Sequence, residues 1–160
     1  MKTFQLEGTP RIDLGKKAVK AIRKQDLIPA VLNGGEIVEM PCNKALKAGE
    51  KVVEIANNKG LIVTDFTVSN DAVRKLIYTP EIFAVDLTIG EKKVMAVVKD
   101  VQFHPVNDRI LHMDFLEVND KKPIVMEVPV ALEGHSEGVK AGGKLSLEMR
   151  KLKVKAIYTQ

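Results

Sequence analysis

Apolar and polar residues alternate along much of this chain in short runs, and residues that favour turns separate the runs. Side chains on a strand point to its two faces in turn, so a period of two predicts strands with one buried face. We expect strands at residues 3–6, 28–32, 37–40, 52–56, 61–68, 81–89, 92–100, 109–118, 124–134 and 152–158. Many short strands with little helix predict a mainly β (α+β) fold, either a barrel or a sandwich with helical decoration.

Turn residues indicate how some of these strands connect. Gly90-Glu91 lies between two apolar runs and predicts a hairpin. Asn33-Gly34-Gly35 permits the positive φ values of a tight hairpin turn, so residues 37–40 are expected to return along the preceding strand. Residues 43–51 are harder to interpret, and a helical turn is our expectation for them.

Two segments have the pattern of a helix. Residues 69–78 are expected to form a short helix with Ser69 or Asn70 as its cap and Asp71 in the first turn. Residues 15–26 are expected to form a helix with one apolar and one basic side. Its apolar side holds Ala18, Val19, Ala21 and Ile22, and its basic side holds Lys16, Lys20, Arg23 and Lys24. This helix should dock by its apolar side and present its charges outward.

The polar stretch "NDKKP" at residues 119–123 interrupts the strand pattern and predicts a domain boundary. We therefore expect a first domain at residues 1–118. Residues 119–160 would form a linker and the start of a β-rich second domain, with a Gly-rich loop at residues 135–145.

Composition narrows the class of protein. The single cysteine, Cys42, forms no internal disulfide, which is typical of a reducing compartment, and a small hydrophobic role for it is favoured over catalysis. Neither a signal peptide nor a membrane-spanning run is recognisable, so we expect a cytoplasmic protein without a membrane partner. The net charge is only +4, yet six basic residues and one acid lie between Arg11 and Lys24. A cluster of this kind favours a polyanionic partner.

The segment "VQFHPVNDRILHMDF" holds the other chemically notable residues. His112 and Asp114 are two apart on an expected strand, so they share one face, and Met113 and Phe115 share the other. On spacing alone, a surface hydrogen-bonded pair is favoured for His112 and Asp114. A metal site built from His104, His112 and Asp114, with His135 as a possible addition, has looser spacing than metal-binding motifs usually show. Together with Gln102 and the basic helix, the pair is also suited to contact a nucleotide.

Three stretches, in this order, resemble one known family. They are "R…GKKAVKAIR…IPAVLNGG", "VKDVQFHPVNDRILHMDFLEV" and "EVPVALEGHSEGVKAGGKL". They closely resemble the bacterial large-subunit ribosomal proteins that bind 5S rRNA, the twenty-fifth large-subunit family, whose two-domain form is called Ctc or general stress protein. The resemblance implies a six-stranded N-terminal β-barrel with small helices, followed by a partial β-rich domain, and binding to the loop E region of 5S rRNA largely through its minor groove.

Matching positions also imply the residues that contact RNA. The basic contacts would be Arg11, Lys16, Lys20 and Arg23, and the contacts borne by strands would be Asn33, Gln102, His112 and Asp114. His104, in the Gln-x-His-Pro turn, would be mainly structural. Asn33 replaces the tyrosine usual in the family, and Lys17 and Ala21 also depart from its pattern. Residues 44–60 resemble an insertion, and the chain stops early for a full second domain.

We therefore expect a structural, non-enzymatic component of the large ribosomal subunit that needs no cofactor and has no small-molecule substrate. Its partners would be 5S rRNA, other large-subunit rRNA and ribosomal proteins. The alternative is a small metal-dependent hydrolase that uses His104, His112 and Asp114.

Overall fold

The computed structural model describes residues 2–13, 15–35, 37–39, 46–56, 59–79, 82–119 and 122–157. Cys42 and Met40 lie outside the described residues, as do positions 43–45 of the expected helical turn. The chain divides into two compact units, Met1–Asn119 and Asp120–Thr159. Each unit is described by itself.

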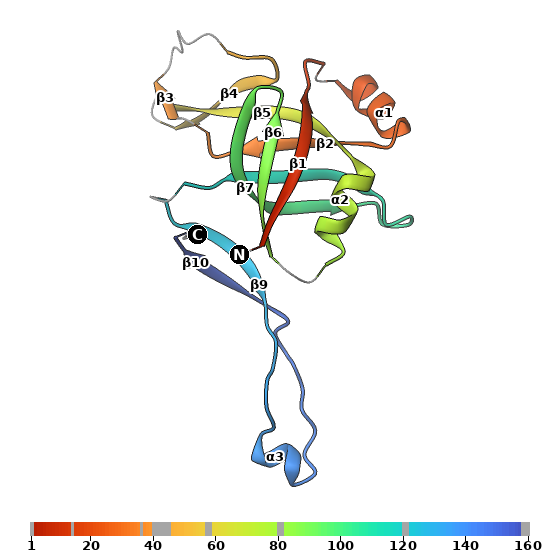
Figure 1. Ribbon diagram of the computed structural model, residues 1–160, viewed down its shortest axis with the longest axis vertical. Coiled ribbons are helices and arrows are strands. Elements are labelled where there is room, and N and C mark those ends of the chain that lie inside the picture. The colour runs from red at the N-terminus through yellow and green to blue at the C-terminus, as the bar shows by residue number, and fades with distance from the viewer. Residues whose placement is uncertain are drawn as a thin grey trace. The chain divides into compact units, whose positions relative to one another are not determined.

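The described part of the first unit contains eight strands and two short helices (Figure 1). The elements are β1 (Lys2–Pro10), α1 (Lys16–Lys24), β2 (Leu27–Asn33), β3 (Ile37–Glu39), β4 (Glu50–Ala56), β5 (Lys59–Ser69), α2 (Asn70–Ile77), β6 (Phe83–Ile89), β7 (Lys92–Phe103) and β8 (Ile110–Glu117). The predicted mainly β fold class is confirmed, and so is the hairpin at Gly90-Glu91, because β6 and β7 pair antiparallel.

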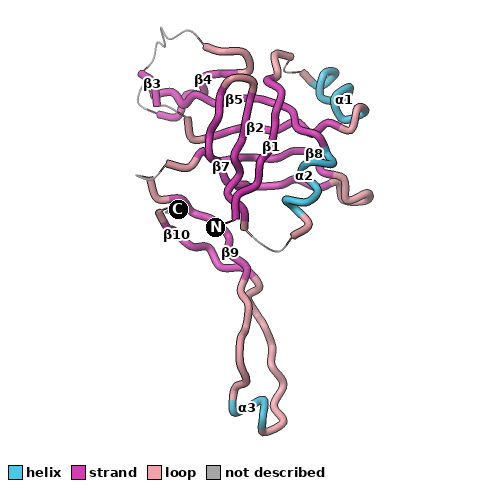
Figure 2. The backbone as a smooth tube through the Cα atoms, in the orientation of Figure 1, coloured by secondary structure: helices cyan, strands magenta, loops and turns pink. Residues whose placement is uncertain are grey.

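Six of these strands close into a barrel (Figure 2). The order around the ring is β1-β6-β7-β8-β2-β5, and antiparallel pairing of β5 with β1 closes it. Two pairs, β1 with β6 and β2 with β8, are parallel. Closure leaves the ring without a free edge, so the choice between barrel and sandwich is settled in favour of the barrel.

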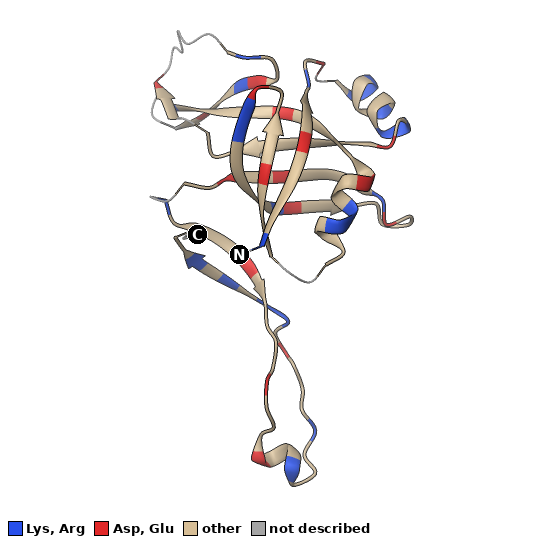
Figure 3. Ribbon diagram, viewed as in Figure 1, with Lys and Arg blue, Asp and Glu red and all other residues tan. Residues whose placement is uncertain are grey.

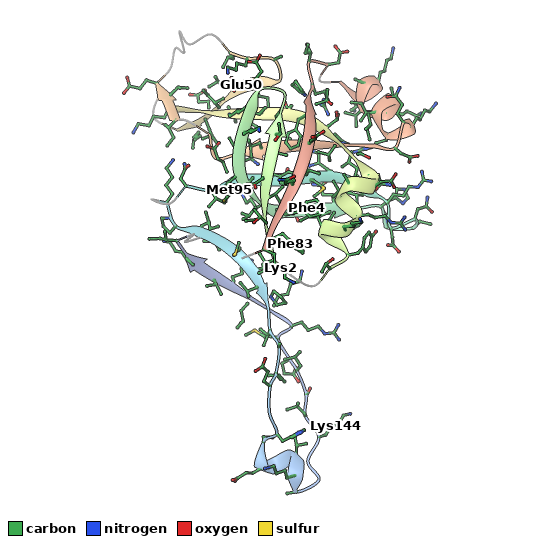
Figure 4. The ribbon with its side chains drawn as sticks, viewed as in Figure 1. Lys2, Phe4, Glu50, Phe83, Met95 and Lys144 are labelled. Atoms are coloured by element: carbon green, nitrogen blue, oxygen red, sulfur yellow. The ribbon has the colours of Figure 1, made fainter. Side chains whose placement is uncertain are left out.

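The barrel interior is filled by side chains from alternate strand positions. Phe66 on β5 and Phe115 on β8 are fully buried, and their ring centroids lie 5.6 Å apart. Helix α2 adds Val73 and Leu76 to the same core. Towards one end Phe4 and Phe83, labelled in Figure 4, pack edge to face at 6.1 Å. The core thus rests mainly on aliphatic residues and a few Phe rings.

Strand β5 is long enough to pair with four neighbours. One edge pairs with β2 and then with β3, and the other edge pairs with β1 and then with β4. β3 and β4 lie off the closed ring, and β4, which belongs to the stretch that resembled an insertion, pairs with β5 beside the barrel. The helical turn expected there is wrong for the described residues, because residues 48–49 form a turn and the strand begins at Glu50.

The hairpin expected after Asn33 is also wrong. β3 pairs with β5 and not with β2. Gly34 has a φ of +94°, and a Cβ there would lie 3.2 Å from the backbone of Glu117. A Cβ on Gly35 would lie 2.5 Å from the carbonyl oxygen of Ile62. The two glycines therefore let the chain pass close to two other strands instead of turning back on itself.

In β8 and in α1, the burial of some side chains differs from the pattern that the sequence predicts. Met113 and Phe115 are fully buried on one face of β8, but Ile110, which strict alternation would place on the face of His112, is buried as well. The register between β7 and β8 shifts between Gln102 and Phe103, which breaks the alternation at this end of β8. On α1, Ala21 is exposed, and Ala18, Val19 and Ile22 are only half buried. This helix is held to the barrel by a narrow apolar strip.

The second unit contains β9 (Ile124–Pro129), α3 (Glu137–Lys140) and β10 (Lys151–Ala156). The two strands pair antiparallel. Residues 135–145, expected as a loop throughout, include the short helix α3. Within the ranges that the structure describes, no helix has the length and apolar character to cross a membrane.

Candidate nucleic-acid interface

Helix α1 forms one wall of an open, basic cleft on the first unit. The cleft has a volume of about 890 Å³. The basic side chains that line it are Arg11, Lys16, Lys20, Arg23, Lys24 and Arg109, and Asp26 is the acid among its lining residues. Figure 3 shows the basic residues along α1. All four basic residues predicted from the sequence therefore line one cleft, which concentrates positive potential there.

Arg23 also fixes the helix to the barrel. Its guanidinium donates a hydrogen bond of 2.9 Å to the carbonyl oxygen of Leu111 on β8. Leu111 directly precedes His112, so this bond joins the basic cleft to the strand that carries the other predicted contacts. One donor of Arg23 is thus used within the protein, and the fork-shaped guanidinium retains others.

Arg109 also lines the cleft but was not predicted from the sequence. His104 stabilises the turn that carries it. Nδ1 of His104 lies 3.2 Å from the amide nitrogen of Val106 and accepts a hydrogen bond from it. The backbone of His104 also bonds to that of Arg109 and Asp108. These bonds agree with the mainly structural role expected for His104. A signal for Arg109 was present, since it stands three residues before His112.

His112 and Asp114 lie on the outer surface of the barrel. Nδ1 of His112 is 3.2 Å from Oδ1 of Asp114, and the two side chains are 27% and 31% exposed. The surface pair favoured from spacing is therefore present. Because Met113 and Phe115 fill the core from the same strand, the imidazole and the carboxylate face outward.

Neighbouring strands extend this outer surface. Gln102 on β7 pairs directly with His112, and Asn33 on β2 pairs with Leu116. Directly paired residues share a face, and Leu116 shares the face of Asp114, so all four predicted strand-borne residues belong to one surface. Gln102 is exposed and Asn33 is half buried.

Asp100 is a second residue that the sequence reasoning missed. It pairs directly with Asp114 across β7 and β8, so the two carboxylates face outward side by side. Oδ1 of Asp100 accepts a hydrogen bond of 2.9 Å from the amide of Val101. Two adjacent carboxylates repel each other, and they make this part of the surface acceptor-rich beside a donor-rich cleft.

The metal-dependent hydrolase is not supported. Across the described ranges, His, Cys, Asp and Glu form no group of three or more that could hold a metal ion. Nδ1 of His104 is engaged by its own turn, and Nδ1 of His112 is directed at Asp114. The three residues proposed as ligands therefore do not act together.

Comparisons with known proteins agree with this arrangement. The sequence model described as Ribosomal L25p family matches residues 6–64 and 42–115. A second model, Ribosomal protein TL5, C-terminal domain, matches residues 123–160. The first pair of matches covers the barrel, and the second covers β9, α3 and β10.

Three similar proteins are each named large ribosomal subunit protein bL25. The protein from Porphyromonas gingivalis is 60% identical over 161 residues, which are 100% of this chain and 71% of the relative. The protein from Parabacteroides distasonis is 57% identical over 165 residues, with 100% and 72% covered. The protein from Bacteroides thetaiotaomicron is 48% identical over 163 residues, with 99% and 70% covered. This chain therefore belongs to the ribosomal L25p family, and it is a structural protein of the cytoplasmic ribosome rather than an enzyme.

Proposed function

We propose that the barrel of this ribosomal protein binds 5S rRNA in the large subunit, at the loop E region. One observation carries the proposal: the bond from Arg23 to the carbonyl of Leu111 joins a cationic cleft to a polar strand surface. A duplex RNA offers both a charged backbone and an edge rich in donors and acceptors. The two parts of this surface are suited to those two features.

The cleft would neutralise phosphates. Lys16 and Lys20 are exposed on α1. Arg11, which directly follows β1, and Arg109, in the turn before β8, line the same cleft. Nε of Arg11 is buried and bonds to none of the described residues. Each lysine or arginine that neutralises a phosphate releases condensed counterions, so this contribution should depend steeply on salt.

The outer surface of β2, β7 and β8 would contact sugars and base edges. The minor groove of an RNA helix is wide and shallow and displays 2′-hydroxyls, which a sheet surface can approach. Asp114 would accept a hydrogen bond from a hydroxyl or a base amino group, and His112 would hold its carboxylate in place. Gln102 and Asn33 can each donate and accept. Other large-subunit rRNA and ribosomal proteins would be the remaining partners.

A salt titration with matched variants tests the phosphate contacts. Lys20→Ala should lower the affinity for 5S rRNA and reduce the slope of log K against log salt by about one phosphate contact. Lys59→Ala removes the same charge at the far end of β5 and serves as the control. Equal slopes for Lys20→Ala and the unaltered protein would remove Lys20 from the interface.

A gel-shift comparison tests the RNA itself. The protein should bind 5S rRNA and lose most of that affinity when the loop E sequence is replaced by a regular duplex. Equal binding to both RNAs would contradict the assignment to loop E. No binding to either RNA would contradict the proposed function as a whole.

A further inference from the structure

The C-terminal end of α2 bears a second basic surface that the predicted contacts leave out. Arg74, Lys75 and Tyr78 line an open groove of about 370 Å³. Arg74 and Lys75 are exposed in the last turn of the helix. Within the ranges that the structure describes, no carboxylate forms an ion pair with either of them. Two cations on one helix end can thus meet a ligand that brings negative charge.

Tyr78 is the more exposed of the two exposed aromatic residues, Tyr78 and Phe103, in the part of the chain that the structure describes. Phe4, Phe66, Phe83 and Phe115 belong to the core or pack against it. Tyr78 is 61% exposed, although it follows a helix whose Leu76 is buried. An exposed phenol ring flanked by cations is the combination that proteins use to stack unpaired nucleotide bases. The ring supplies the stacking surface, and the cations hold the adjacent phosphates.

The groove adjoins the basic cleft of α1. The hydroxyl of Tyr78 lies 3.5 Å from the carbonyl oxygen of Asp108, in the turn between β7 and β8. The next residue, Arg109, lines the cleft. Phe103, the last residue of β7, directly precedes the same turn and is 44% exposed. The turn therefore connects a surface suited to duplex RNA with a surface suited to an unpaired nucleotide.

We propose that Tyr78, Arg74 and Lys75 form a binding site for an unpaired ribonucleotide. Its base stacks on the Tyr78 ring, and its flanking phosphates contact Arg74 and Lys75. The inference rests on the proposed function, because it extends the RNA surface past Arg109. The nucleotide comes either from 5S rRNA itself or from another strand of RNA, and the same chemistry recognises both.

Tyrosine fluorescence of the full chain offers a direct test. The chain has two tyrosines, Tyr78 and Tyr158, and no tryptophan. Tyr158→Phe therefore leaves Tyr78 as the one reporter, and stacking against a base should quench it. The matched control is Tyr78→Phe, which leaves Tyr158 and reports quenching that does not depend on the site. The two probes are 5S rRNA and a single-stranded uridine hexanucleotide, the latter added to the free protein and to the 5S rRNA complex.

Quenching by 5S rRNA in Tyr158→Phe but not in the control supports the site and assigns the nucleotide to 5S rRNA. Quenching only on addition of the hexanucleotide supports the site and assigns the nucleotide to another strand. If neither probe quenches Tyr78 beyond the control, the inference is overturned. Failure of 5S rRNA to bind at all would instead overturn the proposed function, and the hexanucleotide would still test this site.

Variants of Arg74 and Lys75 test whether these two cations contribute to binding of the nucleotide. The double variant Arg74→Ala, Lys75→Ala should bind the hexanucleotide about tenfold more weakly, as measured by the quenching of Tyr78. Lys59→Ala should leave this affinity unchanged. Circular dichroism establishes that the variants are folded. Equal hexanucleotide affinity in the double variant and in Lys59→Ala would remove the cations from the site and contradict the proposal.

Discussion

Both units of this chain contain paired β-strands, but they differ in whether those strands close around a core. In the first unit six strands close into a ring around fully buried side chains such as Phe66 and Phe115. In the second unit two strands form a ribbon, and every described residue of β10 is exposed. Leu152 and Val154 of β10 are 42% and 41% exposed.

The ribbon nevertheless has two distinct faces. Cross-strand pairs bring apolar residues together on one face: Ile124, Met126, Val128, Leu152, Val154 and Ala156. The opposite face carries Lys151, Lys153 and Lys155, with Glu127 3.9 Å from the first two. The described residues of the second unit form no second layer on this amphipathic ribbon, and a two-stranded ribbon by itself has little free energy of folding. Closure into a barrel, rather than the strand pattern alone, is what gives the first unit a core.

The largest expected difference between the units is the cost of deleting an apolar side chain. Phe66→Ala should lower the free energy of unfolding by about 3–5 kcal/mol, because it empties the centre of the barrel. Leu152→Ala in β10 should lower it by less than about 0.5 kcal/mol. Urea unfolding followed by circular dichroism measures both. Similar losses in the two variants would show that the second unit also has a cooperative core.

A smaller difference in stability between the two units is expected when a glycine in each is replaced by alanine. Gly35→Ala should destabilise the barrel by about 1–3 kcal/mol, because the new Cβ would lie 2.5 Å from the carbonyl oxygen of Ile62. Gly138→Ala in α3 meets no atom within 4 Å and should change stability by less than about 1 kcal/mol. Thermal unfolding of the two variants makes the comparison. A neutral Gly35→Ala would mean that the segment after β2 can move away from β5 at this point without cost.

The smallest expected effect is that of removing the second unit. A fragment of residues 1–119 should fold and bind 5S rRNA within about twofold of the affinity of the whole chain, because the barrel holds its own core and the proposed contacts. Isothermal titration of fragment and whole chain with 5S rRNA provides the test. A folded fragment that binds much more weakly would assign RNA contacts to the second unit.

Sequence reasoning predicted elements better than it predicted their pairing. The alternation in β8 correctly placed Met113 and Phe115 on the face opposite His112 and Asp114, since burial of one face imposes a period of two. The partner of β3 was wrong, because Gly34-Gly35 is equally suited to a hairpin and to close passage over another strand. Only the tertiary structure distinguishes these two uses of glycine.

The candidate interface, too, could be predicted from the sequence only in part. Four basic residues were recognisable because they cluster in the sequence, and they line one cleft. Arg109, Asp100 and Tyr78 were missed, since they lie outside the basic cluster of the sequence and reach the interface through the lining of the cleft, strand register and a turn, respectively. The RNA contacts of Arg109 and Tyr78, like those of the predicted residues, are proposals that binding experiments decide.

The central claim is that the outer surface of β8 contacts RNA through a specific acceptor, and Asp114→Asn tests it most directly. This change keeps size but removes a negative charge and replaces one acceptor oxygen with a donor. The account predicts about tenfold weaker binding to 5S rRNA, because a hydrogen bond to the carboxylate is lost. The control is Asp100→Asn, which removes a neighbouring charge whose Oδ1 is already bonded to Val101 and should bind equally or more tightly. Equal or tighter binding by Asp114→Asn would contradict the claim.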